Sequence, residues 1–179
     1  MQNLVLINTS LGQIKYSLDT KAANSTYAFI DLALKGIMNN HKIMRVVKDF
    51  VIQPVYDEEK ECVEYSFLVK GEYKTNDFDN RDMQKYDLCL AGDGKVVSSP
   101  ACYFICLSET AANKLNQKYT VIGSLLEGKN VIDKIANLPT KKIDIGLEKV
   151  IVEEPIDDIR IDSIEIKTQD IILKKPLYL

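Results

Sequence analysis

The hydrophobic positions near the start of the chain follow two different periods. Residues 4–7 and 14–18 are β-type apolar runs on either side of a polar turn that contains Gly12, which predicts an opening β-hairpin. Residues 25–35 instead place their apolar side chains at helical spacing, and Gly36 is suited to end a helix in the left-handed conformation. The predicted fold therefore begins with a hairpin followed by one helix.

Short apolar runs dominate the middle of the chain. Six of them, rich in Val, Ile, Tyr and Phe, follow the first helix, and so many short strands favour a barrel or a sandwich over an alternating parallel sheet. A second amphipathic helix is predicted at residues 130–137, ahead of Pro139, and the alternation in residues 159–166 predicts a half-buried last strand. The six runs are residues 43–47, 50–53, 63–69, 88–91, 103–107 and 119–125.

Length and composition predict one domain. With 179 residues, of which 46% are hydrophobic and 27% charged, the chain is long enough for one sizeable core but short for two. We expect this domain to span residues 1–168. Residues 141–158 are rich in charge and predict a long surface connection, whereas residues 169–179 form an apolar and basic tail that either adds an edge strand or contacts a neighbouring molecule.

Charge and cysteine placement exclude several classes of function. The net charge of −3, with lysines spread among acidic residues, provides no basic field, so we expect no nucleic-acid partner. We also expect a cytoplasmic protein without membrane contact, because neither a signal-peptide pattern nor an apolar run of about 18 residues is present. The cysteines lie in apolar segments without CxxC spacing, which predicts reduced, packed thiols and no metal site. They are Cys62, Cys89, Cys102 and Cys106.

Five short blocks carry a recognisable pattern. The longest are M-R-V-V-K-D-F-V-I-Q at residues 44–53, and Y-F-I at residues 103–105 followed by Y-T-V-I-G-S-L-L-E-G-K-N-V-I-D-K-I at residues 119–135. They resemble the cyclophilin family's F-H-R-V-x-x-x-F-M-x-Q, and its Q-F-F-I followed by V-F-G-x-V-x-x-G-x-x-V-V-x-x-I. The three shorter blocks are T-S-L-G-Q-I-K at residues 9–15, K-G-E-Y at residues 70–73 and S-I-E-I at residues 163–166, so that the likeness covers residues 4–167.

The resemblance implies a mainly β fold, a closed eight-stranded antiparallel β-barrel of cyclophilin type capped by two α-helices. It also implies a peptidyl-prolyl cis-trans isomerase that needs no cofactor, assists protein folding and acts on proline-containing peptides or unfolded protein clients. Rotation about the X-Pro bond meets a barrier of about 18–20 kcal/mol and breaks no bond, so an apolar pocket and a fixed donor near the prolyl nitrogen suffice.

Individual roles follow from the same resemblance. Arg45 is implied to be the catalytic donor, and Gln53 is implied to support it. Phe50, Val51, Phe104 and Leu115 match the positions of the proline pocket. The complete set of residues implied to bind substrate is Phe50, Val51, Ala91, Gly92, Cys102, Phe104, Leu115 and Tyr119.

Departures from the family pattern predict weakened catalysis. If each lost polar contact costs about 1–2 kcal/mol, two or three of them slow the reaction about a hundredfold or more. Lys114, where the family carries tryptophan or histidine, predicts weak binding of the cyclic peptide cyclosporin. The alternative is a catalytically impaired module that binds proline-containing peptides or a protein partner. The other departures are Met44 for histidine, Val51 for methionine, Gly92 for asparagine, Cys102 for glutamine and Tyr119 for histidine.

Overall fold

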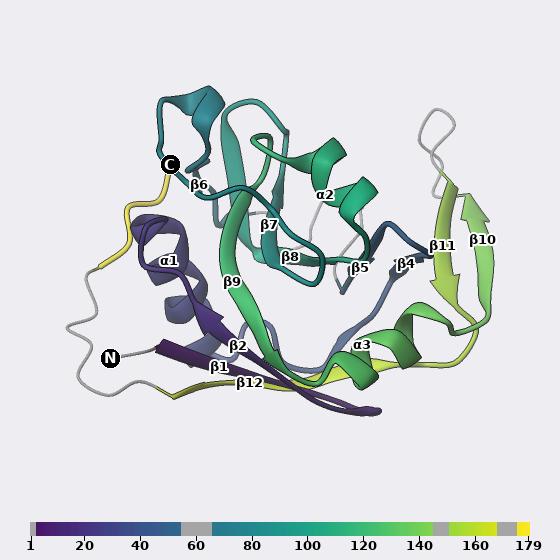
Figure 1. The fold of residues 1–179 in the computed structure, drawn as a ribbon. Coiled ribbons are helices and arrows are strands. Elements are labelled where there is room, and N and C mark those ends of the chain that lie inside the picture. Colours follow the sequence, from purple (N-terminus) through teal and green to yellow (C-terminus); the bar gives the residue numbers. More distant parts are fainter. Residues whose placement is uncertain (1–2, 55–65, 145–150, 168–174) are drawn as a thin grey trace.

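The protein is a curled antiparallel sheet with helices packed on it (Figure 1). The computed structural model describes residues 3–54, 66–144, 151–167 and 175–179. The main sheet has ten strands in the order β3-β12-β1-β2-β9-β7-β8-β5-β4, with β6 paired to β8. The strands are β1 (Asn3–Thr9), β2 (Gly12–Leu18), β3 (His41–Lys42), β4 (Arg45–Val47), β5 (Val51–Gln53), β6 (Val69–Lys70), β7 (Leu88–Gly92), β8 (Val97–Cys106), β9 (Thr120–Glu127) and β12 (Arg160–Lys167).

The two ends of this sheet meet in a single stretch of chain. Strands β3 and β4 are the first and last in the sheet order, yet only Ile43 and Met44 separate them. The Ile43 N–H donates to the carbonyl of Ile159, and the Met44 N–H donates to that of Pro54. The predicted fold class is confirmed. The sheet is a half-barrel of ten strands rather than a closed barrel of eight, because β3 and β4 continue one another along the chain and do not pair.

The two predicted helices are present, and the described residues contain one more α-helix as well as a short 3-10 helix, η2 (Lys74–Asn76). Helices α1 (Ala23–Leu34) and α3 (Lys129–Ala136) lie where the apolar spacing places them, and Gly36 has a positive φ of 70° just beyond α1. The additional helix is α2 (Glu109–Leu115), whose first turn is capped by the Ser108 hydroxyl accepting from the Ala111 N–H. With only seven residues, α2 is too short for its apolar spacing to be recognised.

Helix α1 is capped by a residue from far along the chain. Neither Asn24 nor Ser25 caps the start of α1 with its own side chain. The carboxylate of Glu72 instead accepts from the Asn24 N–H at 3.2 Å and from the Ser25 N–H at 2.6 Å. A carboxylate suits this position because the first N–H groups of a helix lack partners within the helix and carry partial positive charge. This contact ties the segment after β6 to the start of α1.

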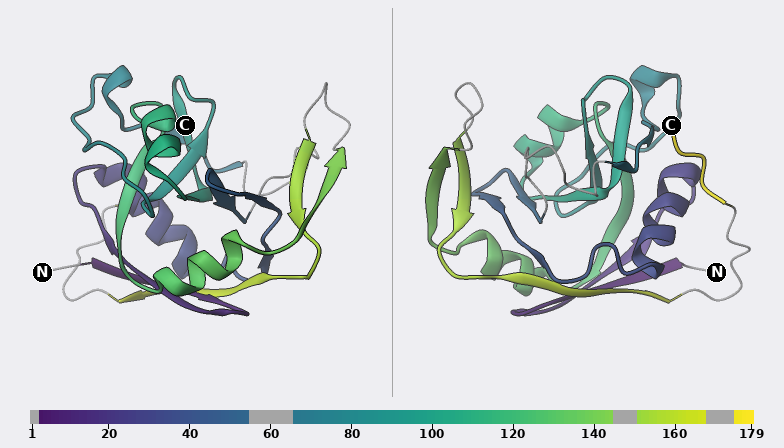
Figure 2. Two further views of the ribbon diagram at one scale, coloured as in Figure 1. Left: turned by 45° about the vertical axis from the view of Figure 1, so that its right-hand side comes forward. Right: turned by 180° about the vertical axis from the view of Figure 1, so that it is seen from behind.

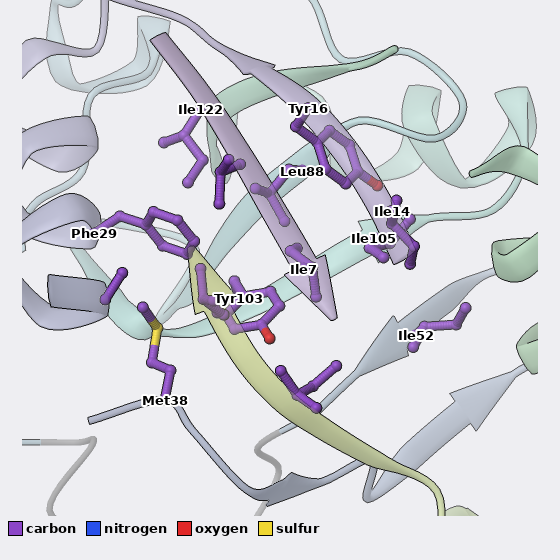
Figure 3. Close-up of a cluster of buried hydrophobic side chains, with 14 of the residues drawn as sticks. Ile7, Ile14, Tyr16, Phe29, Met38, Ile52, Leu88, Tyr103, Ile105 and Ile122 are labelled. Atoms are coloured by element: carbon purple, nitrogen blue, oxygen red, sulfur yellow. The ribbon is translucent and has the colours of Figure 1, made fainter. Parts of the chain in front are cut away.

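The largest core cluster fills the space between α1 and the sheet (Figure 3). Phe29 of α1 and Tyr103 of β8 meet edge to face with ring centroids 5.7 Å apart, and both side chains are buried. A second, smaller cluster lies on the other side of β8. Its buried members are Val51, Met83, Cys89, Phe104, Cys106, Ala111, Ala112 and Val121.

The charged residues after α3 form a hairpin where a surface connection was predicted. Strands β10 (Thr140–Asp144) and β11 (Ile151–Pro155) pair antiparallel as a separate two-stranded sheet (Figures 1 and 2). The register places Lys141 opposite Glu154 and Lys142 opposite Glu153, so opposite charges face each other across the strands. Glu154 is buried and pairs with Lys42 of β3 as well. The charge that predicted a solvated loop therefore stabilises strand pairing.

The last five residues of the chain pack against α1 and the start of β6. The Leu179 N–H donates to the Leu68 carbonyl, and the Tyr178 hydroxyl donates to the carboxylate of Asp31 at 2.8 Å. Asn24 donates to the Leu177 carbonyl and accepts from its N–H. The predicted end of the domain at residue 168 and the start of the tail at residue 169 fall within residues 168–174, which are outside the described residues. The division into domain and tail therefore stays a prediction.

Three of the four cysteines are in the described residues. Cys89, Cys102 and Cys106 are buried thiols that form no disulfide, while Cys62 lies outside these residues. Burial raises the pKa of the Cys106 thiol to about 11, so it stays protonated at neutral pH. Across residues 3–54, 66–144, 151–167 and 175–179, no helix has the length and apolar character to cross a membrane.

Candidate active site

One cleft of about 370 Å³ gathers nearly all of the predicted site residues. It opens where β4, β5, β7 and β8 meet α2 and the start of β9. Nine of the ten predicted residues line it, and no other residue in the described part of the chain does. They are Arg45, Phe50, Val51, Gln53, Ala91, Gly92, Phe104, Leu115 and Tyr119.

Arg45 is held in place by its neighbour across the sheet. Strands β4 and β5 are antiparallel, and their register sets Arg45 directly opposite Gln53. The Arg45 guanidinium Nη1 donates to the Gln53 side-chain oxygen at 3.2 Å, and Gln53 is only 6% exposed. A buried amide that accepts from the guanidinium orients it without neutralising its charge. The cleft thus contains a fixed cationic donor.

The floor of the cleft is apolar and aromatic. Phe104 of β8 is 4% exposed, and Tyr119 meets it edge to face with ring centroids 5.6 Å apart. Val51 is buried beside Phe104 in the smaller core cluster, and Leu115 packs against the same cluster from α2. Side chains alternate along β8, so Tyr103 and Ile105 enter the main core while Phe104 faces the cleft. This floor is shaped to hold a small apolar ring.

Two cations lie against Phe50 at the rim. The Arg45 guanidinium carbon is 5.7 Å from the centroid of the Phe50 ring, and the Lys114 ammonium is 5.3 Å from it. Both distances fall within the range of cation–π attraction. Lys114 is exposed in the last turn of α2, next to Leu115 of the floor. The rim therefore carries positive charge directly beside the apolar floor.

The turn at Gly92 leaves no room for a side chain. A Cβ atom on Gly92 would lie 2.0 Å from the backbone oxygen of Val97, so the asparagine common in the family does not fit this turn. The turn is held by Asp93, whose Oδ1 accepts from the N–H groups of Lys95, Val96 and Val97. These three hydrogen bonds lower the pKa of the Asp93 carboxyl. Sequence reasoning missed this role of Asp93.

Cys102 is the one predicted site residue that does not line the cleft. It is completely buried in β8, two positions before Phe104. The pairing with β7 is interrupted there, because Leu90 pairs with Tyr103 but Ala91 pairs with Ser99, so the register skips residues 100–102. Such a bulge re-aims side chains, so the expected alternation from Phe104 back to Cys102 does not place this thiol in the cleft.

Comparisons with known proteins agree on one family. The sequence profile described as "Cyclophilin type peptidyl-prolyl cis-trans isomerase/CLD" matches residues 4–166. A curated peptidyl-prolyl cis-trans isomerase of Acinetobacter baylyi is 25% identical over 170 residues, covering 92% of this chain and 86% of that protein.

Solved structures share the fold. A cyclophilin-type peptidyl-prolyl cis-trans isomerase of Cryptosporidium parvum superposes with a TM-score of 0.72 at 22% identity, over 95% of this chain and 100% of that one. The same Cryptosporidium parvum enzyme, crystallised in the presence of the dipeptide Ala-Pro, gives a TM-score of 0.73 at 23% identity, over 93% and 99% of the two chains. Similarity at this level of identity establishes the fold.

Proposed function

The chain belongs to the cyclophilin-type peptidyl-prolyl cis-trans isomerase family, and from this premise we propose that it accelerates exchange at X-Pro bonds in the Arg45 cleft. The observation that carries the proposal is the position of one fixed guanidinium beside an apolar, aromatic floor in a single cleft. The substrates are proline-containing peptides or unfolded protein clients. No cofactor enters the reaction.

The geometry provides what amide rotation requires. The proline ring sits on the floor formed by Phe104, Val51 and Leu115, which removes it from water. As the amide twists, the lone pair of the prolyl nitrogen is released from resonance, and the Arg45 guanidinium donates to it. Because this interaction is stronger in the twisted state than in either planar state, it lowers the barrier.

We propose that this protein catalyses the exchange more slowly than a cyclophilin that keeps the family's site residues. Gly92 has only backbone groups with which to bind a peptide, and the side chain of the buried Cys102 does not line the cleft. Val51 makes the pocket shallower than a methionine would. Two or three lost contacts of about 1–2 kcal/mol each correspond to a loss of about a hundredfold or more. A module that binds proline-containing segments without catalysis is the second candidate, and these same departures favour it.

A cytoplasmic location is part of the proposal. The buried Cys89, Cys102 and Cys106 form no disulfide, and a reducing compartment maintains cysteines as thiols. The net charge of −3 supports peptide clients over nucleic acid. Neither nucleic acid nor a membrane is a proposed partner.

Exchange spectroscopy by NMR on a short Ala-Pro peptide tests the proposal. Catalytic amounts of the protein are expected to produce exchange cross-peaks between the cis and trans forms at mixing times where the free peptide shows none, since uncatalysed exchange takes tens of seconds or more. Chemical-shift changes in the peptide without exchange would favour the binding module. A peptide spectrum that does not change at all would contradict both candidates.

Cyclosporin is expected to bind this protein weakly. Lys114 places an ammonium at the rim where the family carries tryptophan or histidine, and a solvated cation presents little apolar surface to the cyclic peptide. Calorimetric titration of the parent and of Lys114→Trp checks this, and the tryptophan variant is expected to bind more tightly. A tight complex with the parent would show that Lys114 does not shape the cyclosporin-facing rim.

A further inference from the structure

We propose that this cleft selects proline peptides that carry an acidic side chain beside the proline, and that Lys114 determines this preference. The inference rests on the proposed function, since it concerns the substrates of the same cleft. The chemistry recognised is an anionic group, either the carboxylate of aspartate or glutamate or the phosphate of a phosphorylated serine.

The first argument is the convergence of two cations on one aromatic ring. Lys114 and Arg45 come from different elements, α2 and β4, yet both approach Phe50 within 5.7 Å of its centroid. Both cations are attracted to the same aromatic ring, which places two positive charges at one point of the rim. An anion placed between them and the floor would be attracted by both cations.

The second argument is that no carboxylate of the described residues pairs with Lys114. Among the described residues, no carboxylate oxygen lies within 4.0 Å of the Lys114 ammonium. Asp49 precedes Phe50 and Glu109 lies in the first turn of α2, and neither forms an ion pair with Lys114. By contrast, Lys15, Lys35, Lys74 and Lys129 each have a carboxylate partner.

The third argument is the position of Lys114 relative to bound substrate. Leu115, the next residue, lines the cleft floor, and Phe50 lines its wall. A peptide whose proline ring rests on this floor carries its neighbouring side chains toward the rim, within reach of a lysine side chain. An ion pair at such a partly exposed rim is expected to favour glutamate over glutamine by about three- to tenfold, and less at high salt.

Matched peptides test the proposal through binding and exchange. Peptides with Glu, Gln, Lys or phosphoserine directly before or after the proline are titrated into the protein, with Kd taken from protein chemical shifts and exchange rates from the peptide. We expect the Gln-to-Glu ratio of Kd values to be about three to ten at one of the two positions. It should fall to about one in Lys114→Met and recover in Lys114→Arg. The phosphoserine peptide shows whether phosphate is preferred to carboxylate.

Lys118→Met is the matched control. Lys118 is exposed three residues beyond Leu115 and does not line the cleft, so this variant is expected to keep the preference for glutamate. Equal Kd values for the Glu and Gln peptides in the parent would overturn the inference, as would a preference that persists in Lys114→Met. Failure of the acidic preference and failure of catalysis give different results. A difference in Kd that depends on Lys114, with no exchange on any peptide, would support the acidic preference and contradict the proposed isomerase activity.

Discussion

Replacing Arg45 by alanine is expected to lower kcat/KM for an Ala-Pro peptide by about a hundredfold or more, because removing one oriented donor to a developing charge costs about 10²–10³ in rate. Among the described residues that line the cleft, Arg45 carries the only cationic side chain, and Gln53 orients it. NMR exchange measured side by side on parent and variant checks the result. Equal rates would remove Arg45 from the mechanism.

Two further variants separate charge from orientation. Arg45→Lys keeps a positive charge but replaces the planar fork by a flexible ammonium, so it is expected to recover only a minor part of the lost rate. Gln53→Ala keeps the guanidinium but removes the side-chain oxygen that orients it. This variant is expected to lose less of kcat/KM than Arg45→Ala. Arg45 is half-exposed at one end of the sheet, so circular dichroism and the thermal midpoint of Arg45→Ala should remain close to those of the parent.

Replacing Glu72 by alanine is expected to lower the free energy of unfolding by about 2–4 kcal/mol, which is the cost of leaving buried N–H groups without a charged acceptor. Glu72 is 7% exposed, and its carboxylate accepts from the first N–H groups of α1. Urea denaturation followed by circular dichroism measures the change. Glu72→Gln keeps an acceptor without the charge and should lose less.

Glu109→Ala is the matched control for Glu72. Glu109 also lies in the first turn of a helix, but it is exposed, so its loss is expected to cost less than about 1 kcal/mol. If Glu72→Ala and Glu109→Ala lowered the free energy of unfolding equally, the buried cap would not be a major source of stability.

Much of the fold and almost all of the cleft follow from local sequence. The opening hairpin and α1 are set by apolar spacing that can be read within about ten residues. Every described residue that lines the cleft was predicted from the sequence. The motif from residue 44 to residue 53 forms a tight β4–β5 hairpin that presents Arg45, Phe50 and Gln53 together. These elements and cleft residues could be predicted because the apolar spacing and the family motif indicate the same local structure.

The features that were missed depend on partners distant in sequence. The cap of α1 comes from Glu72, 48 residues beyond Asn24, and no local pattern marks that pairing. The β10–β11 hairpin is rich in charged residues and buries Val152 and Glu154, so its composition suggested a surface connection. The bulge at residues 100–102 breaks strand parity, which is why Cys102 does not line the cleft as the resemblance implied. Each case is a tertiary contact that overrides a local rule.

The pairing of β1 with β12 bears on how the protein folds as it is made. Leu4 pairs with Lys167, so nearly the whole domain is synthesised between the two partners. At a synthesis rate of about 5–20 residues per second, one edge of β1 stays unpaired for roughly 10–30 s. An unpaired strand edge can associate with the edge of another chain. Strand β3 also depends on β12, and β3 leads directly into the strand of Arg45. We therefore expect the nascent chain to acquire its Arg45 cleft late, only after its own folding is nearly complete.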